Sequence, residues 1–361
     1  MLIGHGGNIY AMAKKLGCQP SDIIDMSSNV NPMGPPSGLI DFLKGKMGFV
    51  TALPEADSRH AAESFAAYAG IDPARVLAGN GSSQFIYSAP LCLKSKNALI
   101  LGPTYSDYED ACRLHGATVR FAYSRASEQF IPDFDRLSEQ AETADTIFIC
   151  NPNNPTGVLI PREKLLAFCQ SRPNQTFIID ESYMPFADDG ENQSLANASL
   201  DNVVILVSIS KIFKMPGLRV GFVISTPGTI EKFKSHIPPW NMNSLAQAAV
   251  IHIADQKEQM DQFTRNTRLF LDGQKKIFSK ALETSPFLTL YPCVASFMLI
   301  GLPPWISAGE LCAKLAEERI LIRNCENFSG LDSSFIRVAF KEETSNLILA
   351  DRLSQLAKRL D

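Results

Sequence analysis

The stretch of sequence that decides the fold is VSISKIFKMPGLRVG, residues 207–221. It begins at the end of an apolar run that is expected to form a buried strand, and then turns through Ser208, Ser210 and Lys211. In a parallel sheet this position is the carboxyl edge, where α/β proteins bind their ligands. A lysine amine partly withdrawn from water has its charged form disfavoured, so Lys211 is a candidate nucleophile toward a carbonyl group.

Arg219 follows in the same stretch, beside Gly217 and Gly221. The glycines let the backbone approach a ligand closely, and a guanidinium can bind a phosphate through two parallel hydrogen bonds. Taken alone, Lys211 is better explained as a solvated surface lysine. The neighbouring motifs therefore have to decide whether this turn belongs to a ligand site.

Outward from this stretch, apolar runs alternate with longer helical patterns. The alternation predicts an α/β fold in which helices cover a mostly parallel sheet. The expected strands are 98–101, 146–150, 176–180, 203–208 and 220–224. With 361 residues the chain is long enough for about two domains. We expect an N-terminal segment at 1–44 that packs with the smaller domain, a large domain at 45–245, and a small α+β domain at 246–361 with short strands at 296–300, 320–323 and 335–339.

Composition and charge exclude several classes of protein. The chain has 34 Lys and Arg against 38 Asp and Glu, a net charge of −4, which provides no global field for nucleic acid or an anionic membrane. Its eight cysteines never approach C-x-x-C spacing, which favours free thiols in a reducing cytoplasm and predicts no metal site. The start, MLIGHGGNIY, lacks the pattern of a secretion signal, and prolines interrupt the uncharged stretch 284–309. We expect a cytoplasmic protein without a nucleic-acid or membrane partner.

Three further motifs carry polar residues at expected strand ends. In LAGNGSS, residues 77–83, a glycine-rich turn opens a helix at 81–93 that Ser82 or Asn80 can cap, and its free N–H groups can bind a phosphate. In ICNPNNPTGVL, residues 149–159, the Asn-Pro pairs predict a rigid turn that projects Asn154 over the sheet edge. In FIIDESYMPF, residues 177–186, Asp180 ends a strand and needs a cationic partner, with Tyr183 close behind. Each motif alone is consistent with ordinary turn chemistry.

In this order and spacing, the motifs resemble the fold-type I pyridoxal-phosphate enzymes of the aminotransferase class, over essentially the whole chain. The resemblance implies that the mostly parallel sheet has about seven strands. It also implies that Lys211 forms an imine with the cofactor aldehyde and later moves the proton at the substrate Cα. Asp180 would pair with the pyridine nitrogen, and Asn154 and Tyr183 would hydrogen-bond the phenolate oxygen. Tyr105, in LGPTYSDY, would stack on the ring. The cofactor phosphate would be held by Gly81, Ser82, Ser83, Ser208, Ser210 and Arg219.

Within that class the chain is most similar to the histidinol-phosphate aminotransferase branch, and there to the threonine-phosphate decarboxylases of cobalamin biosynthesis. The matching segments are HGGNIYAMAKKLG (5–17), DMSSNVNPMGPP (25–36), IPPWNMNSLAQ (237–247) and LIRNCENFSGLDSSFIRVAF (321–340). The resemblance implies that Arg337 binds a substrate carboxylate, and that Arg323 with His5 and Asn8 binds a substrate phosphate. Gly6 and Asn31 complete the expected substrate site, with Asn154 shared between substrate and cofactor.

Two positions depart from the family pattern. In VTALPEAD, residues 50–57, Leu53 stands where family members usually have a tyrosine that reaches the neighbouring subunit's cofactor phosphate. The resemblance implies a homodimer, so that contact is absent here or supplied by another group. Tyr183 is frequent in aminotransferases of this branch, whereas decarboxylases can have phenylalanine there. The cofactor is therefore better determined than the reaction.

Three functions stay open. The first is decarboxylation of L-threonine O-3-phosphate to (R)-1-amino-2-propanol O-2-phosphate, or of L-serine O-phosphate to ethanolamine phosphate. These substrates differ by one methyl group, which a pocket separates by only ~1–3 kcal/mol. The second is a histidinol-phosphate-type aminotransferase. The third is a non-catalytic pyridoxal-phosphate-binding module, which the intact Lys211 disfavours.

Overall fold

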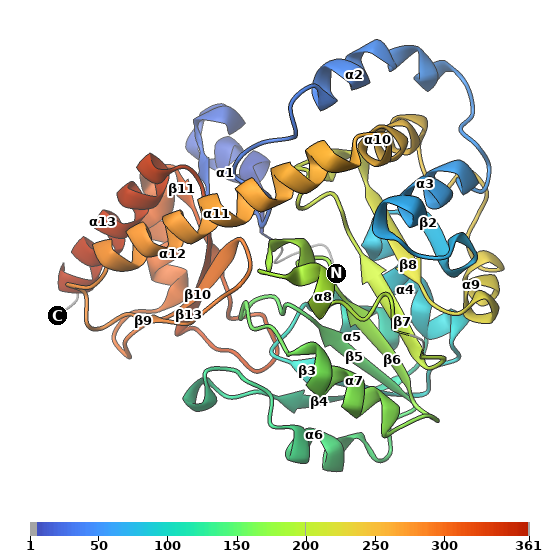
Figure 1. The fold of residues 1–361 in the computed structure, drawn as a ribbon. Helices are drawn as coiled ribbons and strands as arrows, with labels where there is room; N and C mark the ends of the chain where they lie inside the picture. The colour runs from blue at the N-terminus through green and yellow to red at the C-terminus, as the bar shows by residue number, and fades with distance from the viewer. Residues whose placement is uncertain (1–5, 199, 360–361) are drawn as a thin grey trace.

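The structure, a computed structural model, describes residues 6–198 and 200–359. Its centre is a seven-stranded sheet in which only β8 runs antiparallel to its neighbours (Figure 1). In spatial order the strands are β2 (Val76–Asn80), β8 (Val220–Ile224), β7 (Val203–Val207), β6 (Thr176–Asp180), β5 (Thr146–Cys150), β3 (Asn97–Gly102) and β4 (Thr118–Tyr123). The mostly parallel α/β sheet predicted from the alternating pattern is confirmed.

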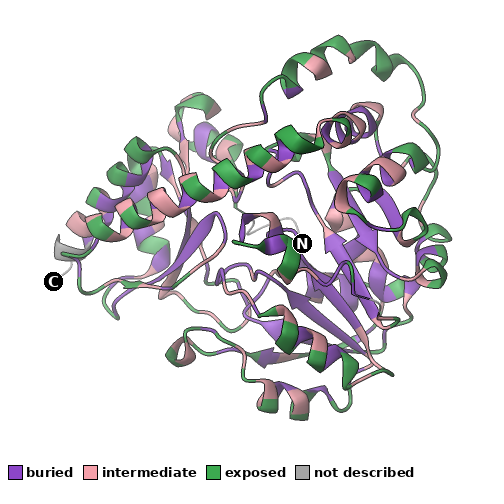
Figure 2. Cartoon of the chain, in the orientation of Figure 1, coloured by how far each residue is buried: buried purple, intermediate pink, exposed green. Residues whose placement is uncertain are grey.

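The sheet is buried on both faces because successive side chains of a strand point to opposite sides. Figure 2 shows the strands as the most continuously buried part of the chain. On one face Phe148 and Val204 pack against α4 (Ser82–Cys92), α5 (Asp107–Leu114) and α9 (Pro227–Lys234). On the other, Ile147 and Ile205 join a core shared with α3 (Arg59–Ala69), α6 (Phe134–Ala141), α7 (Arg162–Gln170) and α10 (Ser244–Asp255).

A smaller antiparallel sheet lies beside the large one. Its spatial order is β12 (Arg323–Asn324), β13 (Phe335–Ala339), β10 (Phe297–Gly301) and β9 (Thr289–Leu290). The helices α12 (Ala308–Glu317) and α13 (Glu343–Arg359) accompany it, and the long helix α11 (Lys257–Ala281) runs between the two sheets (Figure 1). The buried residues of α11 recur at helical spacing.

The first part of the N-terminal segment lies with this second region, whereas its last helix, Leu39–Gly45, contacts α10 of the large region (Figure 1). The segment contains α1 (Ile9–Leu16), β1 (Ile24–Asp25) and α2 (Leu39–Gly45), and β1 pairs in parallel with β11 (Ile320–Leu321). The remaining helix, α8 (Gly190–Gln193), follows β6. The domain boundaries near residues 45 and 245 stay predictions.

Two local expectations are wrong. The single strand expected at 320–323 is two short strands that join different sheets, β11 with β1 and β12 with β13. Neither Ser82 nor Asn80 caps α4, because Gly81 is its N-cap residue and no side chain caps the helix. The first N–H groups of α4 therefore carry no side-chain cap at the edge of the large sheet.

Candidate active site

A cavity of about 520 Å³ brings the two regions together at the carboxyl ends of the large sheet's strands. It is lined by these predicted site residues: Gly6, Ser82, Ser83, Tyr105, Asn154, Asp180, Tyr183, Lys211, Arg323 and Arg337. Six others do not line it, namely Gly81, Asn8, Asn31, Ser208, Ser210 and Arg219. His5 lies outside the described residues.

Asp180 ends β6 and is buried at the floor of the cavity. Its Oδ1 accepts from the Ser182 backbone N–H at 2.9 Å, and its Oδ2 accepts from the Tyr108 hydroxyl at 2.9 Å. Burial, followed by the charge of Asp180, raises the pKa of Tyr108 well above its usual value, so this phenol stays a donor. The carboxylate is thus oriented from two sides.

Lys211 lies in the loop after β7. The loop is fixed by Ser210, whose Oγ donates to the Val220 carbonyl at 3.1 Å, and by the Asn31 backbone N–H, which donates to the Lys211 carbonyl at 3.0 Å. The ammonium of Lys211 lies 5.9 Å from the centre of the Tyr183 ring. The sheet therefore presents an amine, a carboxylate and a phenol to one cavity.

The turn before α4 and the residue Arg219 form an anion cradle beside this group. Arg219 Nη2 donates a hydrogen bond to Ser83 Oγ at 3.5 Å. A Cβ on Gly81, whose φ is +79°, would lie 2.6 Å from Arg219 Nη2, and a Cβ on Gly221 would lie 2.1 Å from Ser82 N. Only glycines permit this approach of a guanidinium to an uncapped helix start, which is an arrangement that binds phosphate.

Arg337, on β13, forms the opposite wall and is buried. Its guanidinium donates to Asn154 Oδ1 and, at 2.8 Å, to the Ser27 carbonyl. Its Nε is buried without a hydrogen-bond partner in the described part of the chain. Burial lowers the pKa of Arg337. A buried cation with an unused donor is costly unless a ligand completes it, so this wall is suited to an anion.

Arg323 lies opposite Arg337 on the neighbouring strand β12. It donates to Asn327 Oδ1 at 2.5 Å and packs over the Phe328 ring at 4.9 Å. Burial, and then the charge of Arg337, lowers the pKa of Arg323 to about 10. A buried and a half-buried cation on paired strands indicate a ligand with more than one negative charge.

The N-terminal segment reaches the cavity differently from the sequence expectation. Asn31 is turned away from it: its Nδ2 donates to the Ile212 carbonyl and to Thr267 Oγ1, both at 2.8 Å. Asn8 caps α1 by accepting from the Ala11 N–H at 3.0 Å. In place of Asn31 the cavity has Asn29, whose Nδ2 donates to the Tyr183 hydroxyl at 3.3 Å and whose Oδ1 has no partner among the described residues.

Sequence reasoning missed Tyr108, Asn29, Lys214 and Lys341, all of which line the cavity. Tyr108 carried a weak signal, because it lies one helical turn after Tyr105 at the start of a helix. The two lysines carried none, since nothing in their local sequence separates them from solvated lysines. Across the described ranges, no group of three His, Cys, Asp or Glu side chains is placed to hold a metal ion.

The family model described as aminotransferase class I and II matches residues 21–353. The chain therefore belongs to this family of fold-type I enzymes, and its cofactor is pyridoxal 5'-phosphate. The cavity fits that group: it offers an amine, a buried carboxylate and a glycine-lined phosphate cradle.

Individual relatives have more specific names than the family as a whole. The chain is 31% identical to the threonine-phosphate decarboxylase of Salmonella typhimurium over 95% of this chain and 93% of that protein. It is 30% identical to the adenosylcobalamin biosynthesis bifunctional protein CobDQ of Leptospira interrogans, over 98% of this chain but only 41% of that longer protein. The crystal structure of the histidinol-phosphate aminotransferase from Clostridium acetobutylicum superposes with a TM-score of 0.85 at 29% identity, covering 93% of this chain and all of that one.

No helix within the described ranges is both long and apolar enough to cross a membrane.

Proposed function

We propose that the chain decarboxylates a phospho-amino acid, with L-threonine O-3-phosphate as substrate and 1-amino-2-propanol O-2-phosphate as product, in cobalamin biosynthesis. The observation that carries this proposal is Arg337, which faces the cavity of Lys211 and Asp180 with a buried, unpartnered Nε. Such a donor suits a substrate carboxylate, and Arg323 beside it suits a second anionic group. The relatives named for threonine-phosphate decarboxylation support the same substrate class.

Bound pyridoxal 5'-phosphate supplies an aldehyde that captures an amine and a ring that accepts electrons from the substrate Cα. Lys211 would hold the aldehyde and exchange protons at Cα. Asp180, oriented by Tyr108 and Ser182, would hold the pyridine nitrogen. Ser82, Ser83 and Arg219 would hold the phosphate, and Tyr183 with Asn154 the phenolate oxygen.

The reaction is selected by which bond at Cα stands perpendicular to the cofactor ring. Arg337 is tied to Asn154 in the large region and to the Ser27 carbonyl in the N-terminal segment. A carboxylate held by Arg337 is therefore fixed relative to both the sheet and the small region. Positioning of this kind changes rates by orders of magnitude. We infer that Arg337 holds the carboxylate in the orientation for its release.

A histidinol-phosphate-type aminotransferase is the second candidate, favoured by Tyr183 in the cavity and by the likeness to the Clostridium enzyme. Arg337 would then hold the carboxylate of an amino-acid partner while Arg323 held the phosphate of the other substrate. The two candidates share the cofactor residues and differ in the bond that breaks.

The deciding experiment incubates the cofactor-loaded protein with L-threonine O-3-phosphate or L-serine O-phosphate, with and without 2-oxoglutarate. We expect carbon dioxide release that does not need 2-oxoglutarate. Arg337→Gln should lower kcat/KM roughly 100-fold, the effect of removing one member of a buried charged contact. The exposed Arg113→Gln is the matched control. Amino transfer to 2-oxoglutarate without carbon dioxide release would refute the decarboxylase and favour the aminotransferase.

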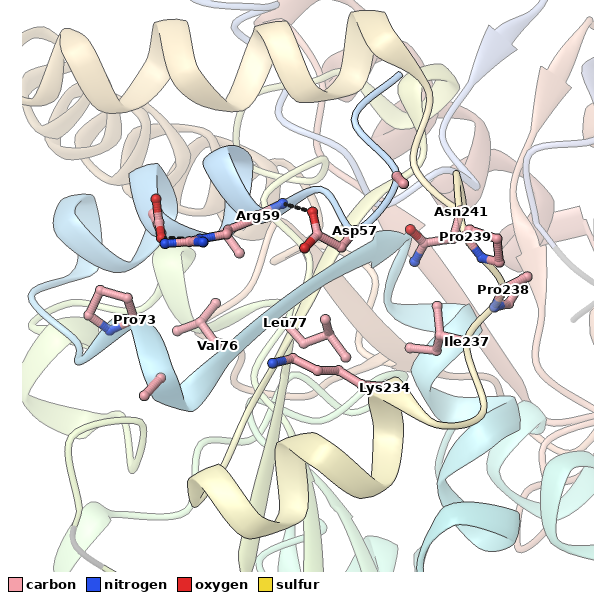
Figure 3. A pocket seen from close by; sticks show the side chains of 14 residues that line it. Asp57, Arg59, Pro73, Val76, Leu77, Lys234, Ile237, Pro238, Pro239 and Asn241 are labelled. Carbon is pink, nitrogen blue, oxygen red and sulfur yellow. Dashed lines mark hydrogen bonds and ion pairs between the residues drawn. The ribbon is translucent and has the colours of Figure 1, made fainter. Parts of the chain in front are cut away.

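We also propose that two copies of the chain associate through the segment around η2 (Met47–Thr51). Val50 and Leu53 are 60% and 74% exposed there, and Trp240, also exposed, is linked to the segment by its backbone N–H bond to Ala56. Beside this segment lies a cavity of about 490 Å³ between β2, α3 and α9, lined by prolines and aliphatic side chains together with Asp57, Arg59, Glu63, Lys234 and Asn241 (Figure 3). Exposed large apolar side chains near such a cavity support the proposal that this face is an interface.

A further inference from the structure

Two lysines that the proposed chemistry does not use, Lys214 and Lys341, line the active-site cavity. The charged residues of that lining are five cations (Lys211, Lys214, Arg323, Arg337 and Lys341) and two carboxylates (Asp25 and Asp180). In the ranges that the structure describes, none of the five cations has an ion-pair partner within 4.0 Å. The cavity is thus positively charged in a chain with a net charge of −4.

The two carboxylates offset only part of this charge, because they are two against five cations and neither lies within 4.0 Å of a cation in the ranges that the structure describes. Asp25 accepts from the backbone N–H and the hydroxyl of Ser27, at 2.9 and 2.7 Å, and from the same two groups of Ser28, at 3.2 and 2.5 Å. Asp180 accepts from Tyr108 and Ser182. The excess of positive charge is left for ligands.

Lys341 lies directly beside Arg337. Its ammonium donates to the Ser28 carbonyl at 3.3 Å, while Arg337 donates to the carbonyl of the preceding residue, Ser27, at 2.8 Å. Lys341 is half-buried, and this contact uses one of its three N–H donors. Arg323 lies on the strand paired with β13, so Arg337 has a cation on each of two flanks.

Lys214 reaches the same place from the loop of Lys211. Its backbone has φ +45°, a conformation that favours glycine and that an L side chain adopts at an energetic cost. Lys214 and Lys341 line the same cavity. Burial lowers the pKa of Lys341, the charge of Asp25 opposes that change, and the positive charge of Lys214 adds to it. Glu342, the residue after Lys341, also has a carboxylate, and it accepts a hydrogen bond from the Ser345 hydroxyl.

We propose that Lys341 and Lys214 form a phosphate-binding arm of the substrate site, next to the carboxylate position at Arg337. A phosphate dianion between the two lysines would accept hydrogen bonds from their ammonium groups. Its negative charge would also reduce the repulsion between the two positive charges. This inference rests on the proposed function for the identity of the substrate. The phosphate itself is common to the decarboxylase and to the histidinol-phosphate-type alternative.

The test has two parts. Calorimetry measures the binding of inorganic phosphate to the cofactor-loaded protein. The change in KM for L-threonine O-3-phosphate is then compared with the change in affinity for L-threonine, which lacks the phosphate. We expect Lys341→Met to weaken phosphate binding and to raise KM for the phosphorylated substrate roughly 10-fold, the effect of losing one charge-assisted hydrogen bond. Lys341→Arg should stay within roughly 3-fold of the parent protein, because it keeps the charge. The affinity for L-threonine should not change in any of them.

Lys214→Gly gives a second, independent variant. It should weaken phosphate binding several-fold without lowering the melting temperature, because glycine suits the left-handed backbone. Lys94→Gly is the matched control: Lys94 also has positive φ, at +56°, but is exposed and does not line the cavity. The control should bind phosphate as the parent does. If Lys341→Met does not fold, Lys214→Gly and Lys341→Arg still decide.

Unchanged phosphate affinity in Lys214→Gly and Lys341→Met overturns the proposal. So does an equal loss of affinity for L-threonine and for its phosphate, since that is the signature of a distorted cavity. If phosphate binding depends on the two lysines but the enzyme transaminates, this inference holds and the decarboxylase proposal is refuted. If the enzyme decarboxylates but phosphate binding does not depend on either lysine, the decarboxylase proposal holds and this inference is refuted.

Discussion

At the residue scale, Glu181 follows Asp180 directly but its carboxyl lines a different, more apolar cavity behind the sheet edge. It accepts from the Ser194 hydroxyl and, at 2.8 Å, from the Leu195 N–H. Burial raises its pKa from 4.5 to about 7, with Asp180 adding to the rise and Arg162 opposing it. The site therefore has two adjacent carboxyl groups with opposite surroundings, one directed to the ligand and one held in the core.

The raised pKa of Glu181 makes stability depend on pH. Between about 4.5 and 7 the unfolded chain ionises this group while the folded chain keeps its proton, so stability falls as pH rises through this window. The full loss is roughly 3 kcal/mol. Glu181→Gln cannot ionise; its amide oxygen can still accept from the Leu195 N–H, and its amide nitrogen can donate to the Ser194 hydroxyl oxygen. Its stability relative to the parent should therefore increase from pH 5 to pH 8 in urea unfolding. The exposed Glu163→Gln is the control, and an advantage of Glu181→Gln that does not change with pH would contradict this account.

The sequence located the residues that sit at strand ends, and it did so for a physical reason. Lys211, Asp180 and Asn154 follow apolar runs whose length and composition determine where each strand stops. Asn29 and Asn31 are different, because they lie in an irregular segment where no period indicates direction. Which of the two faces the cavity depends on partners more than 150 residues away, such as Tyr183 and Thr267.

At the scale of elements, Asn31 joins three of them. Its backbone N–H binds the Lys211 carbonyl, and its side chain binds the Ile212 carbonyl and Thr267 on α11. The N-terminal segment, the lysine loop and the helix between the two sheets are thus connected through one buried amide. Asn31 is a positioning residue for Lys211 rather than a residue of the cavity wall.

Asn31→Ala should therefore lower both stability and cofactor affinity. It leaves the Ile212 carbonyl and the Thr267 hydroxyl without this donor, at a cost of roughly 1–3 kcal/mol. Thermal unfolding and equilibrium dialysis of pyridoxal 5'-phosphate measure the two effects. Asn266→Ala, an exposed change one residue from Thr267, should stay within about 0.5 kcal/mol of the parent. A variant as stable as the parent, with the same cofactor affinity, would show that the lysine loop does not need this clamp.

The strands could be predicted far better than the connections between them. Parallel strands buried on both faces read as continuous apolar runs, and 146–150, 176–180 and 220–224 match the structure to the residue. The run at 320–323 does not, because its two halves pair with β1 and β13. Pairing with strands far away in the sequence leaves no local signal, and the same limitation hid Lys341 beside Arg337.

At the scale of the whole molecule, the exposed apolar residues around η2 form the proposed contact between two copies of the chain. Val50, Leu53 and Trp240 are exposed together beside the cavity of Figure 3. A second copy that covers this surface would also bring Leu53 to its partner, where the family usually has tyrosine. The chain would then lack one hydroxyl donor at the partner's cofactor phosphate, and its own Arg219 and α4 would have to suffice.

Leu53→Glu should therefore separate the copies, because it buries an unpaired charge in the apolar contact. Light scattering after gel filtration should give the mass of two chains for the parent and of one chain for the variant at the same concentration. Leu114→Glu, an equally drastic change at an exposed position on α5, should leave two chains. Leu53→Tyr should keep the dimer and, if position 53 reaches the partner's site, raise cofactor affinity. A Leu53→Glu protein that still has the mass of two chains would mean that the copies meet elsewhere.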